Sequence, residues 1–329
     1  MQTREIYFEQ TGDASVLKLR HHALDKPGPG QVLLKQYACG LNFIDIYYRT
    51  GLYPCALPSG LGMEAAGEIL ALADDVTGFA VGDRVAYAGG ALGAYADYRI
   101  MPADRLLVLP DAISYQQAAA MMLQGLTVQY LFERLYPLKA GDTILFHAAA
   151  GGVGLLACQW AKALGVTLIG TVGSDEKAEL ALKHGCSHVI NYKQEDFVAR
   201  VKQLTQGKGV PVVYDSLGQA SFTGSLDCLQ ARGLMVSFGN ATGAVPPFSL
   251  SELAARGSLF ITRPSLAHYT ADRQELVAAA DSLFKRVLAG DLQIQIHQRY
   301  DLADAAQAHR EMEARQTTGS SILLCESGL

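Results

Sequence analysis

The feature that most constrains this chain of 329 residues is an apolar strand that runs into glycines and then directly into a helix. Residues 141–154 read GDTILFHAAAGGVG, and the helical stretch LLACQWAKAL follows at once. Glycines let a backbone approach phosphate groups, whose negative charge the N–H groups at a helix start then meet. The spacing is A-x-G-G-x-G rather than G-x-G-x-x-G, with Ala149 in the first glycine's place. The segment predicts a pyrophosphate site, and a tight turn without a ligand is the alternative. The residues expected to hold the pyrophosphate are Ala150, Gly151, Gly152 and Val153, and Gly154 is expected to let the helix pack on the strand.

The rhythm of apolar runs divides the chain into two parts. Residues 1 to about 110 contain short apolar runs broken by Gly and Pro, which predict a compact all-β unit. From about 126 to 262, apolar strands alternate with helices, which predicts a parallel sheet with helices on both faces. The tail has a long amphipathic helix, a strand, a helix and a closing strand, and we expect it to return to the first part. The predicted fold is α/β, with domains 1–125 plus 264–329 and 126–263.

The end of the second strand of this alternating region bears on the choice of nicotinamide cofactor. An enzyme that uses NAD places a carboxylate there, about 20 residues beyond the glycines, to bind the ribose hydroxyl. Here VTLIGTV ends at Gly173, and Ser174 and Lys177 follow. A small residue, a hydroxyl and an ammonium suit a 2′-phosphate, which favours NADPH over NADH. Asp175 and Glu176 are the counter-evidence, although acids in a first helical turn also suit the helix dipole. Taken alone, Lys177 would be a solvated helix-face lysine.

Composition and charge exclude several classes of protein. The formal net charge is −5 and no run of Lys or Arg forms a stripe, so we expect no nucleic-acid partner. The start of the chain has no basic segment followed by an apolar one, and no apolar run reaches the roughly 18 residues that cross a bilayer. The six cysteines form no Cys-x-x-Cys pair, which favours reduced thiols in a cytoplasmic protein.

The glycine segment, continued to Lys162, resembles the signature of the quinone oxidoreductase (zeta-crystallin-like) branch of the medium-chain dehydrogenase/reductase superfamily. The likeness extends over most of the chain and is particular to the bacterial NADPH:quinone oxidoreductases. It includes CGLNFIDIYYRTGLYP, LPSGLGMEAAGEI, LGAYADYRI, VVYDSLG and SLDCLQARGLMVSFGNATG. The resemblance implies a GroES-like β domain made from both chain ends, a central Rossmann domain, and an active site in the cleft between them.

The same resemblance makes the zinc positions of the superfamily's alcohol dehydrogenases informative. Those enzymes use a cysteine before an S/T-D pair, the histidine of Gly-His-Glu, and a cysteine near the start of the central domain. The matching stretches here contain Asn42, Met63 and Leu123-Gln124, which are poor zinc ligands. We therefore expect no metal. A quinone suits such a protein, because it is already electrophilic and its reduction gives a delocalised anion.

The resemblance also implies residues near the reacting ring. Asn42 would hydrogen-bond a substrate oxygen or the nicotinamide ribose, and Tyr47 and Tyr53 would offer flat faces to a planar acceptor. Packing between strands and loops is the alternative for these tyrosines, and it is the favoured interpretation for Tyr48. We expect Asp45 to cap a helix or to form an ion pair rather than to act as an acid.

Further cofactor contacts are implied at strand ends and in the tail. Thr127 is expected near the nicotinamide and Tyr192 near the adenosine, whereas Arg315 is expected either at the phosphates or as a surface charge. His147 lies in an apolar strand and is expected to be a core imidazole. The remaining expected contacts follow the fourth and fifth strands: Ser216, Phe238, Gly239 and Asn240.

The function that these features favour is NADPH-dependent, zinc-independent hydride transfer to a quinone. One alternative is a reductase of the C=C bond of α,β-unsaturated ketones or aldehydes. The other is a non-catalytic NADPH-binding or RNA-binding protein. The negative net charge disfavours RNA binding. The resemblance implies a homodimer through the apolar edge strand near residues 258–261.

Overall fold

A computed structural model describes residues 1–325 and divides them into two compact units. Unit 1 comprises Met1–Leu126, Thr270–Gly290 and the described residues from Ile294 onward. Unit 2 comprises Thr127–Tyr269 and Asp291–Gln293. The last four residues of the expected first domain, 326–329, lie outside the described part of the chain.

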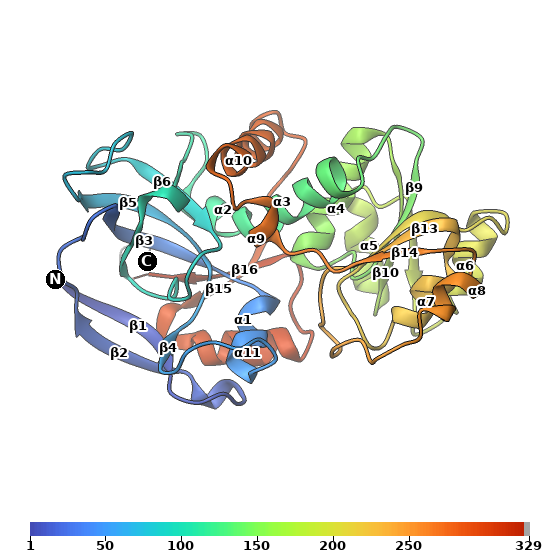
Figure 1. Cartoon of the computed structure of the whole chain (residues 1–329), viewed down its shortest axis with the longest axis horizontal. Helices are drawn as coiled ribbons and strands as arrows, with labels where there is room; N and C mark the ends of the chain where they lie inside the picture. Colours follow the sequence, from blue (N-terminus) through green and yellow to red (C-terminus); the bar gives the residue numbers. More distant parts are fainter. Residues whose placement is uncertain (326–329) are drawn as a thin grey trace. The chain divides into compact units, whose positions relative to one another are not determined.

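Unit 1 is built on two sheets, one of three strands and one of seven. The small sheet has the order β2-β1-β4, and the large one the order β15-β16-β3-β5-β6-β8 with β7 also paired to β3. The last strand pairs antiparallel with β3, with Leu323 opposite Cys39, so the tail of the chain extends this sheet (Figure 1). The strands are β1 (Gln2–Phe8), β2 (Lys18–Ala23), β3 (Gln31–Leu41), β4 (Ser59–Gly60), β5 (Glu64–Leu72), β6 (Arg84–Ala88), β7 (Tyr98–Pro102), β8 (Leu107–Val108), β15 (Ile296–Asp301) and β16 (Ser320–Leu324).

Unit 1 also contains helices, so the prediction of an all-β unit is wrong for residues 43–50. Helix α1 (Phe43–Thr50) begins at a capping box in which the Asp45 carboxylate accepts the Asn42 backbone N–H at 2.8 Å. It ends at Gly51, whose φ of 83° suits a glycine C-cap. The other helices of this unit include α2 (Tyr115–Ala119), α10 (Arg273–Leu288) and α11 (Ala305–Glu313), and α3 (Met122–Gln129) runs from unit 1 into unit 2.

Unit 2 is a six-stranded parallel sheet in the order β11-β10-β9-β12-β13-β14. The order reverses between β9 and β12, and right-handed crossovers on either side of this point put helices on opposite faces. The strands are β9 (Thr143–Phe146), β10 (Thr167–Val172), β11 (His188–Asn191), β12 (Val210–Asp215), β13 (Leu229–Ser237) and β14 (Phe260–Thr262). The helices include α4 (Gly152–Leu164), α5 (Asp175–Lys183), α6 (Phe197–Leu204), α7 (Phe222–Asp227), α8 (Ser251–Ala255) and α9 (Leu266–Tyr269).

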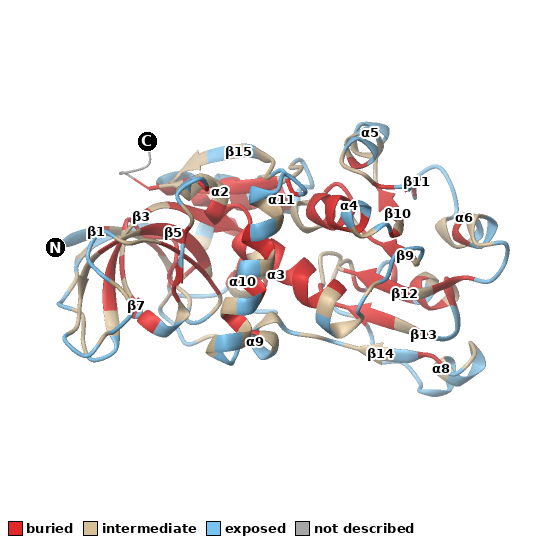
Figure 2. Cartoon of the chain, turned by 90° about the horizontal axis from the view of Figure 1, so that it is seen from above, coloured by how far each residue is buried: buried red, intermediate tan, exposed pale blue. Residues whose placement is uncertain are grey.

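Each unit buries the central strands of its sheets and exposes the outward faces of its helices. Figure 2 shows the strands as mostly buried, whereas much of α5 and α6 is exposed. The core of unit 1 includes Leu34, Ile69 and Tyr87, and that of unit 2 includes Leu145 and Val213, all with at most 1% of their surface exposed. This burial fits apolar runs that are continuous rather than alternating.

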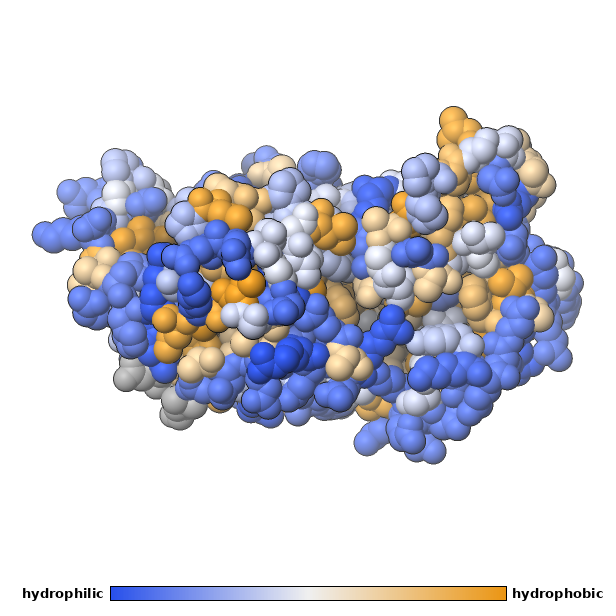
Figure 3. Space-filling view, turned by 90° about the horizontal axis from the view of Figure 1, so that it is seen from below, coloured by the Kyte–Doolittle hydropathy of each residue, from blue (hydrophilic) through white to orange (hydrophobic). Residues whose placement is uncertain are grey.

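No helix within residues 1–325 combines the length and the apolar character needed to cross a membrane. On the face drawn in Figure 3, apolar side chains occur in separate groups among polar ones.

Candidate functional site

The glycine segment forms the turn between β9 and α4. Gly151 is the N-cap of α4, and it has no side chain with which to cap the helix. Ala148 takes a left-handed backbone conformation, with φ of 58°, just before the turn. Because the first N–H groups of a helix have no acceptor within the helix, those at the start of α4 can bind an anion. The turn also follows β9, at the point where the strand order reverses.

Residues 151 and 154 of this turn are glycines for different structural reasons. A Cβ on Gly154 would overlap the Ala148 carbonyl and would lie 2.7 Å from the Ala149 Cα, so only glycine lets α4 pack this closely on the turn. A Cβ on Gly151 would lie 3.4 Å from the Ala148 carbonyl oxygen, an ordinary contact. The fold therefore requires glycine at 154, whereas at 151 the missing side chain leaves room beside the amides.

The end of β10 holds the residues expected to select the cofactor. Ser174 is the N-cap of α5, and its hydroxyl accepts the Lys177 backbone N–H at 3.3 Å. Asp175 accepts hydrogen bonds from Asn191 at 2.8 Å and Gln194 at 3.0 Å. The hydrogen bond from Asn191 is the largest of the effects that lower the pKa of Asp175. The Asp175 carboxylate, which is the counter-evidence to NADPH, therefore accepts hydrogen bonds from two side-chain amides of the segment that follows α5.

Two loops meet beyond the ends of β12 and β13. The Asp215 carboxylate accepts the backbone N–H groups of Leu217 and Gly218 at 2.8 and 3.1 Å, which fixes the first loop. A Cβ on Gly239 would lie 2.9 Å from the Ser216 Cα, so glycine permits the close approach of the second loop. The structure thus brings together the expected cofactor contacts Ser216, Phe238, Gly239 and Asn240.

His147 is a buried structural residue. Its Nδ1 lies 2.8 Å from the Thr171 hydroxyl, and its Nε2 lies 2.9 Å from the Ser225 hydroxyl. Burial lowers its pKa, so the neutral imidazole is favoured. Both ring nitrogens thus have partners within unit 2.

In unit 1, Asn42 lies in a buried hydrogen-bond chain. Its Nδ2 donates to Glu64 Oε2 at 2.7 Å, and its Oδ1 accepts from Gln124 Nε2 at 3.3 Å. The Ser320 hydroxyl donates to Gln124 Oε1 at 2.8 Å. The sequence did not single out Glu64, Gln124 or Ser320 as functional residues. The one signal for them was an acid, Glu64, at the start of a strand that is mostly apolar.

Two carboxyl groups close to Asn42 are fully buried. Asp45 accepts the Asn42 backbone N–H and the Tyr95 hydroxyl, at 2.8 and 2.9 Å. Burial raises the pKa of Asp45 to about 7 and that of Glu64 to about 8, although hydrogen bonds oppose both shifts. Asp45 thus caps α1.

The predicted tyrosines form an edge-to-face cluster at the end of α1. The ring centroids of Tyr47 and Tyr53 are 5.2 Å apart, and those of Tyr48 and Tyr53 are 5.7 Å apart. The Tyr53 backbone N–H donates to the Tyr47 carbonyl at 2.9 Å. The three rings pack on one another. Tyr47 and Tyr48 lie on the helix that Asn42 caps, and Tyr53 lies just after its end.

The predicted residues are distributed over both units. Asn42, Tyr47 and Tyr53 gather around α1 in unit 1, and the residues of the glycine turn belong to unit 2. Thr127 belongs to unit 2 and is buried, whereas Arg315 is exposed just after α11 in unit 1.

The donor groups near Asn42 do not fit a zinc ion. Within residues 1–325, no three His, Cys, Asp or Glu side chains gather as metal ligands. The positions of the superfamily's zinc ligands offer an amide at Asn42 and a thioether at Met63. The nearby Glu64 carboxyl already accepts the Leu123 N–H and the Asn42 amide. Zinc prefers thiolate, imidazole or free carboxylate ligands.

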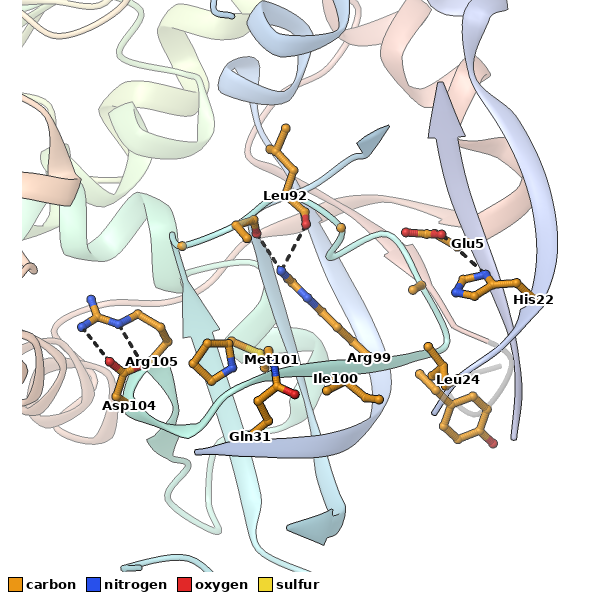
Figure 4. A pocket seen from close by; sticks show the side chains of 16 residues that line it. Glu5, His22, Leu24, Gln31, Leu92, Arg99, Ile100, Met101, Asp104 and Arg105 are labelled. Atoms are coloured by element: carbon orange, nitrogen blue, oxygen red, sulfur yellow. Dashed lines mark hydrogen bonds and ion pairs between the residues drawn. The ribbon is translucent and has the colours of Figure 1, made fainter. Parts of the chain in front are cut away.

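A hollow of about 780 Å³ lies elsewhere in unit 1 (Figure 4). Its lining includes Glu5, His22, Arg99 and Met101. Figure 4 shows the Arg99 guanidinium turned toward backbone carbonyls, and it donates to that of Ala91 at 2.6 Å. None of the predicted site residues lines this hollow.

Comparisons with known proteins place the chain in a family. Residues 28–111 match the family model described as alcohol dehydrogenase GroES-like domain, and residues 152–281 match that described as zinc-binding dehydrogenase. A quinone oxidoreductase of Pseudomonas aeruginosa is 54% identical over 98% of this chain and 99% of its own length. The crystal structure of Escherichia coli quinone oxidoreductase complexed with NADPH is 50% identical, with a TM-score of 0.96 over 98% of this chain and 99% of that one. A 2-haloacrylate reductase of Burkholderia sp is 45% identical over 91% of this chain and 92% of its own length.

The two matched domains are those of a medium-chain dehydrogenase/reductase. Within that class, the chain belongs to the quinone oxidoreductase family. The resemblance noted in the sequence is therefore confirmed, as is the α/β fold with a GroES-like and a Rossmann domain.

Proposed function

We propose that this protein transfers hydride from NADPH to a quinone without a metal ion. The observation that carries the proposal is the uncapped, glycine-lined start of α4 at the switch point of the parallel sheet. It occurs in a chain that is 50% identical to a quinone oxidoreductase whose crystal structure holds NADPH.

The residues of unit 2 fit the parts of NADPH. The pyrophosphate rests on the amides of residues 150–153, because Gly151 leaves room beside them. Ser174 and Lys177 hold the 2′-phosphate, while the hydrogen bonds from Asn191 and Gln194 hold the Asp175 carboxylate toward the segment that follows α5. When bound, NADPH supplies the hydride. Further contacts are proposed from Asn42, Thr127, Gly173, Tyr192, Ser216, Phe238, Gly239, Asn240 and Arg315.

The residues around α1 bind and orient the acceptor. Asn42 donates a hydrogen bond to an acceptor oxygen, while Tyr47 and Tyr53 contact the face of its ring. A quinone that has received hydride is a delocalised anion, so it needs orientation and one hydrogen bond more than it needs an acid. Binding and orientation of the acceptor by these three side chains require no metal ion at Asn42.

A second candidate reaction is reduction of an activated C=C bond. The relative named 2-haloacrylate reductase, at 45% identity, favours it, because a haloacrylate carries such a bond. The test compares NADPH oxidation by the purified protein with 1,4-benzoquinone, with an enone and with 2-chloroacrylate, each with and without a chelator. We expect the fastest turnover with the quinone and no effect of the chelator. Faster reduction of either alkene would overturn the choice of substrate.

We further propose that the protein works as a homodimer in the cytoplasm. Strand β14 stands at the edge of the sheet and exposes 61% of Phe260, which pairing with a second copy would cover. The six cysteines are thiols, which suits a reducing compartment.

A further inference from the structure

The buried carboxyl of Glu64 has two oxygens in different situations. Oε1 accepts the backbone N–H of Leu123 at 2.8 Å. Oε2 accepts the side-chain amide of Asn42 at 2.7 Å. A backbone N–H cannot turn away and is always a donor, whereas a side-chain amide can present either its nitrogen or its oxygen. A proton on this carboxyl must therefore sit on Oε2, facing Asn42.

Protonation of Glu64 has a consequence for the amides beyond it. An O–H on Oε2 needs an acceptor, so Asn42 must present Oδ1 in place of Nδ2. Its Nδ2 then faces Gln124, which must present Oε1, and Gln124 Nε2 then faces the Ser320 hydroxyl. Since a hydroxyl both donates and accepts, Ser320 can end the chain in either direction. The chain of three hydrogen bonds thus has two complete arrangements, and the structure holds the one that suits a carboxylate.

We propose that Glu64 is a positioning residue whose proton sets the direction of the Asn42 amide, and that the protonated arrangement is the one that reduces the acceptor. The second part depends on the proposed function, in which Asn42 contacts an acceptor oxygen. A carboxylate 2.7 Å from the Asn42 amide would oppose the negative charge that this oxygen gains, and the neutral acid would not.

The surroundings of Glu64 favour this neutral form. Gly40 on β3 leaves space for the carboxyl, since a Cβ there would overlap Glu64 Oε2. The titratable groups that face it are Asp45 on α1 and the Tyr95 hydroxyl between β6 and β7. The negative charge of Asp45 adds to burial in raising the pKa of Glu64, and burial keeps Tyr95 protonated by raising its pKa.

The test is the Glu64→Gln variant, which copies the acid at every pH. Its amide oxygen can accept the Leu123 N–H while its nitrogen donates to Asn42 Oδ1. We measure kcat/KM for 1,4-benzoquinone from about pH 6 to about pH 9, with KM for NADPH alongside. The wild type should lose about tenfold per pH unit above its midpoint. Glu64→Gln should match the wild type within about threefold at the acid end and stay level to about pH 9.

An activity-independent measurement tests the first part of the proposal. Infrared difference spectra between the wild type and Glu64→Gln should contain the C=O band of a protonated carboxyl at neutral pH, shifted in heavy water and lost as the pH rises. Asp45→Asn removes the neighbouring buried carboxyl and should keep both the band and the alkaline loss.

Either of two results would overturn the proposal: a Glu64→Gln variant with the same alkaline loss as the wild type, or spectra without the band. A wild type that does not oxidise NADPH with any quinone would instead refute the proposed function. The band would still report on the proton in that case.

Discussion

The Tyr192 hydroxyl stands where a side chain on residue 173 would point: a Cβ on Gly173 would lie 2.6 Å from that oxygen. The two residues meet because β10 and β11 pair Val172 with Asn191, so the chain leaves both strands at the same edge of the sheet. Glycine at 173 therefore has a second role besides leaving the end of β10 without a carboxylate. It makes room for the tyrosine proposed to contact the adenosine.

Gly173→Ala should weaken NADPH binding, because the new methyl group displaces Tyr192. We expect Kd, measured by fluorescence titration, to rise about tenfold. Tyr192→Phe removes the overlapping oxygen, so adding it to Gly173→Ala should recover most of the loss. If the double variant bound as weakly as Gly173→Ala alone, the contact would not be the cause.

Lys177→Ala should lower the preference for NADPH over NADH. A lysine–phosphate hydrogen bond contributes about 1.5 kcal/mol, so kcat/KM for NADPH should fall about tenfold while that for NADH stays constant. Lys183→Ala, in the last turn of the same helix, is the matched control and should change neither. Equal losses with both cofactors would contradict the proposed role of Lys177.

The Rossmann unit could be predicted from the sequence because its signals are local. Apolar runs fixed the strands to within a few residues, and the glycines marked the start of α4. One boundary could not be placed in this way: α7 ends at Asp227, and β13 begins two residues later at Leu229. Apolar residues suit a buried helix and a buried strand equally well, so periodicity alone could not place the change.

The surroundings of Asn42 could not be predicted, because their signals are not local. Glu64, Gln124 and Ser320 lie in three distant segments that only the completed sheet brings together. Helix α1 was missed for a different reason: its capping residues lay in a region whose turns and short apolar runs indicated strands.

Phe260→Arg should separate the proposed dimer. A charge on the edge strand opposes pairing with a second copy, so sedimentation should give a particle of 35.2 kDa where the wild type gives twice that mass. Leu182→Arg places the same charge on α5, at a leucine that is 50% exposed, and should leave the dimer intact. A wild type that sediments as a monomer would contradict the proposed assembly.

His309 should make the fold sensitive to acid. Burial, aided by Arg49, lowers its pKa from 6.5 to about 3, so the unfolded chain takes up this proton first as the pH falls. Its contribution to stability is therefore present above about pH 6.5 and is lost below it, by about 1.4 kcal/mol per pH unit. The raised pKa values of Asp45 and Glu64 act in the opposite sense, as stability lost when the pH rises toward 7 and 8.

The His309→Phe variant isolates this contribution, since the two carboxyls remain. Urea unfolding between about pH 4.5 and about pH 6.5 should give a slope of unfolding free energy against pH that is lower, in the sense of more negative, by about 1.4 kcal/mol per unit than in the wild type. The same change at the exposed His188 serves as control. Identical slopes in His309→Phe and the wild type would refute the prediction.

The central claim is that bare backbone amides at the start of α4 hold the cofactor, and Gly151→Ala tests it most directly. A methyl group at 151 meets only an ordinary contact within the protein, so Tm should hardly change, whereas at Gly154 it would overlap the turn and lower Tm. In a fluorescence titration, the wild type should bind one NADPH per chain, and Gly151→Ala should bind it at least about tenfold more weakly. Unchanged affinity in a folded Gly151→Ala variant, or no binding by the wild type, would contradict the account.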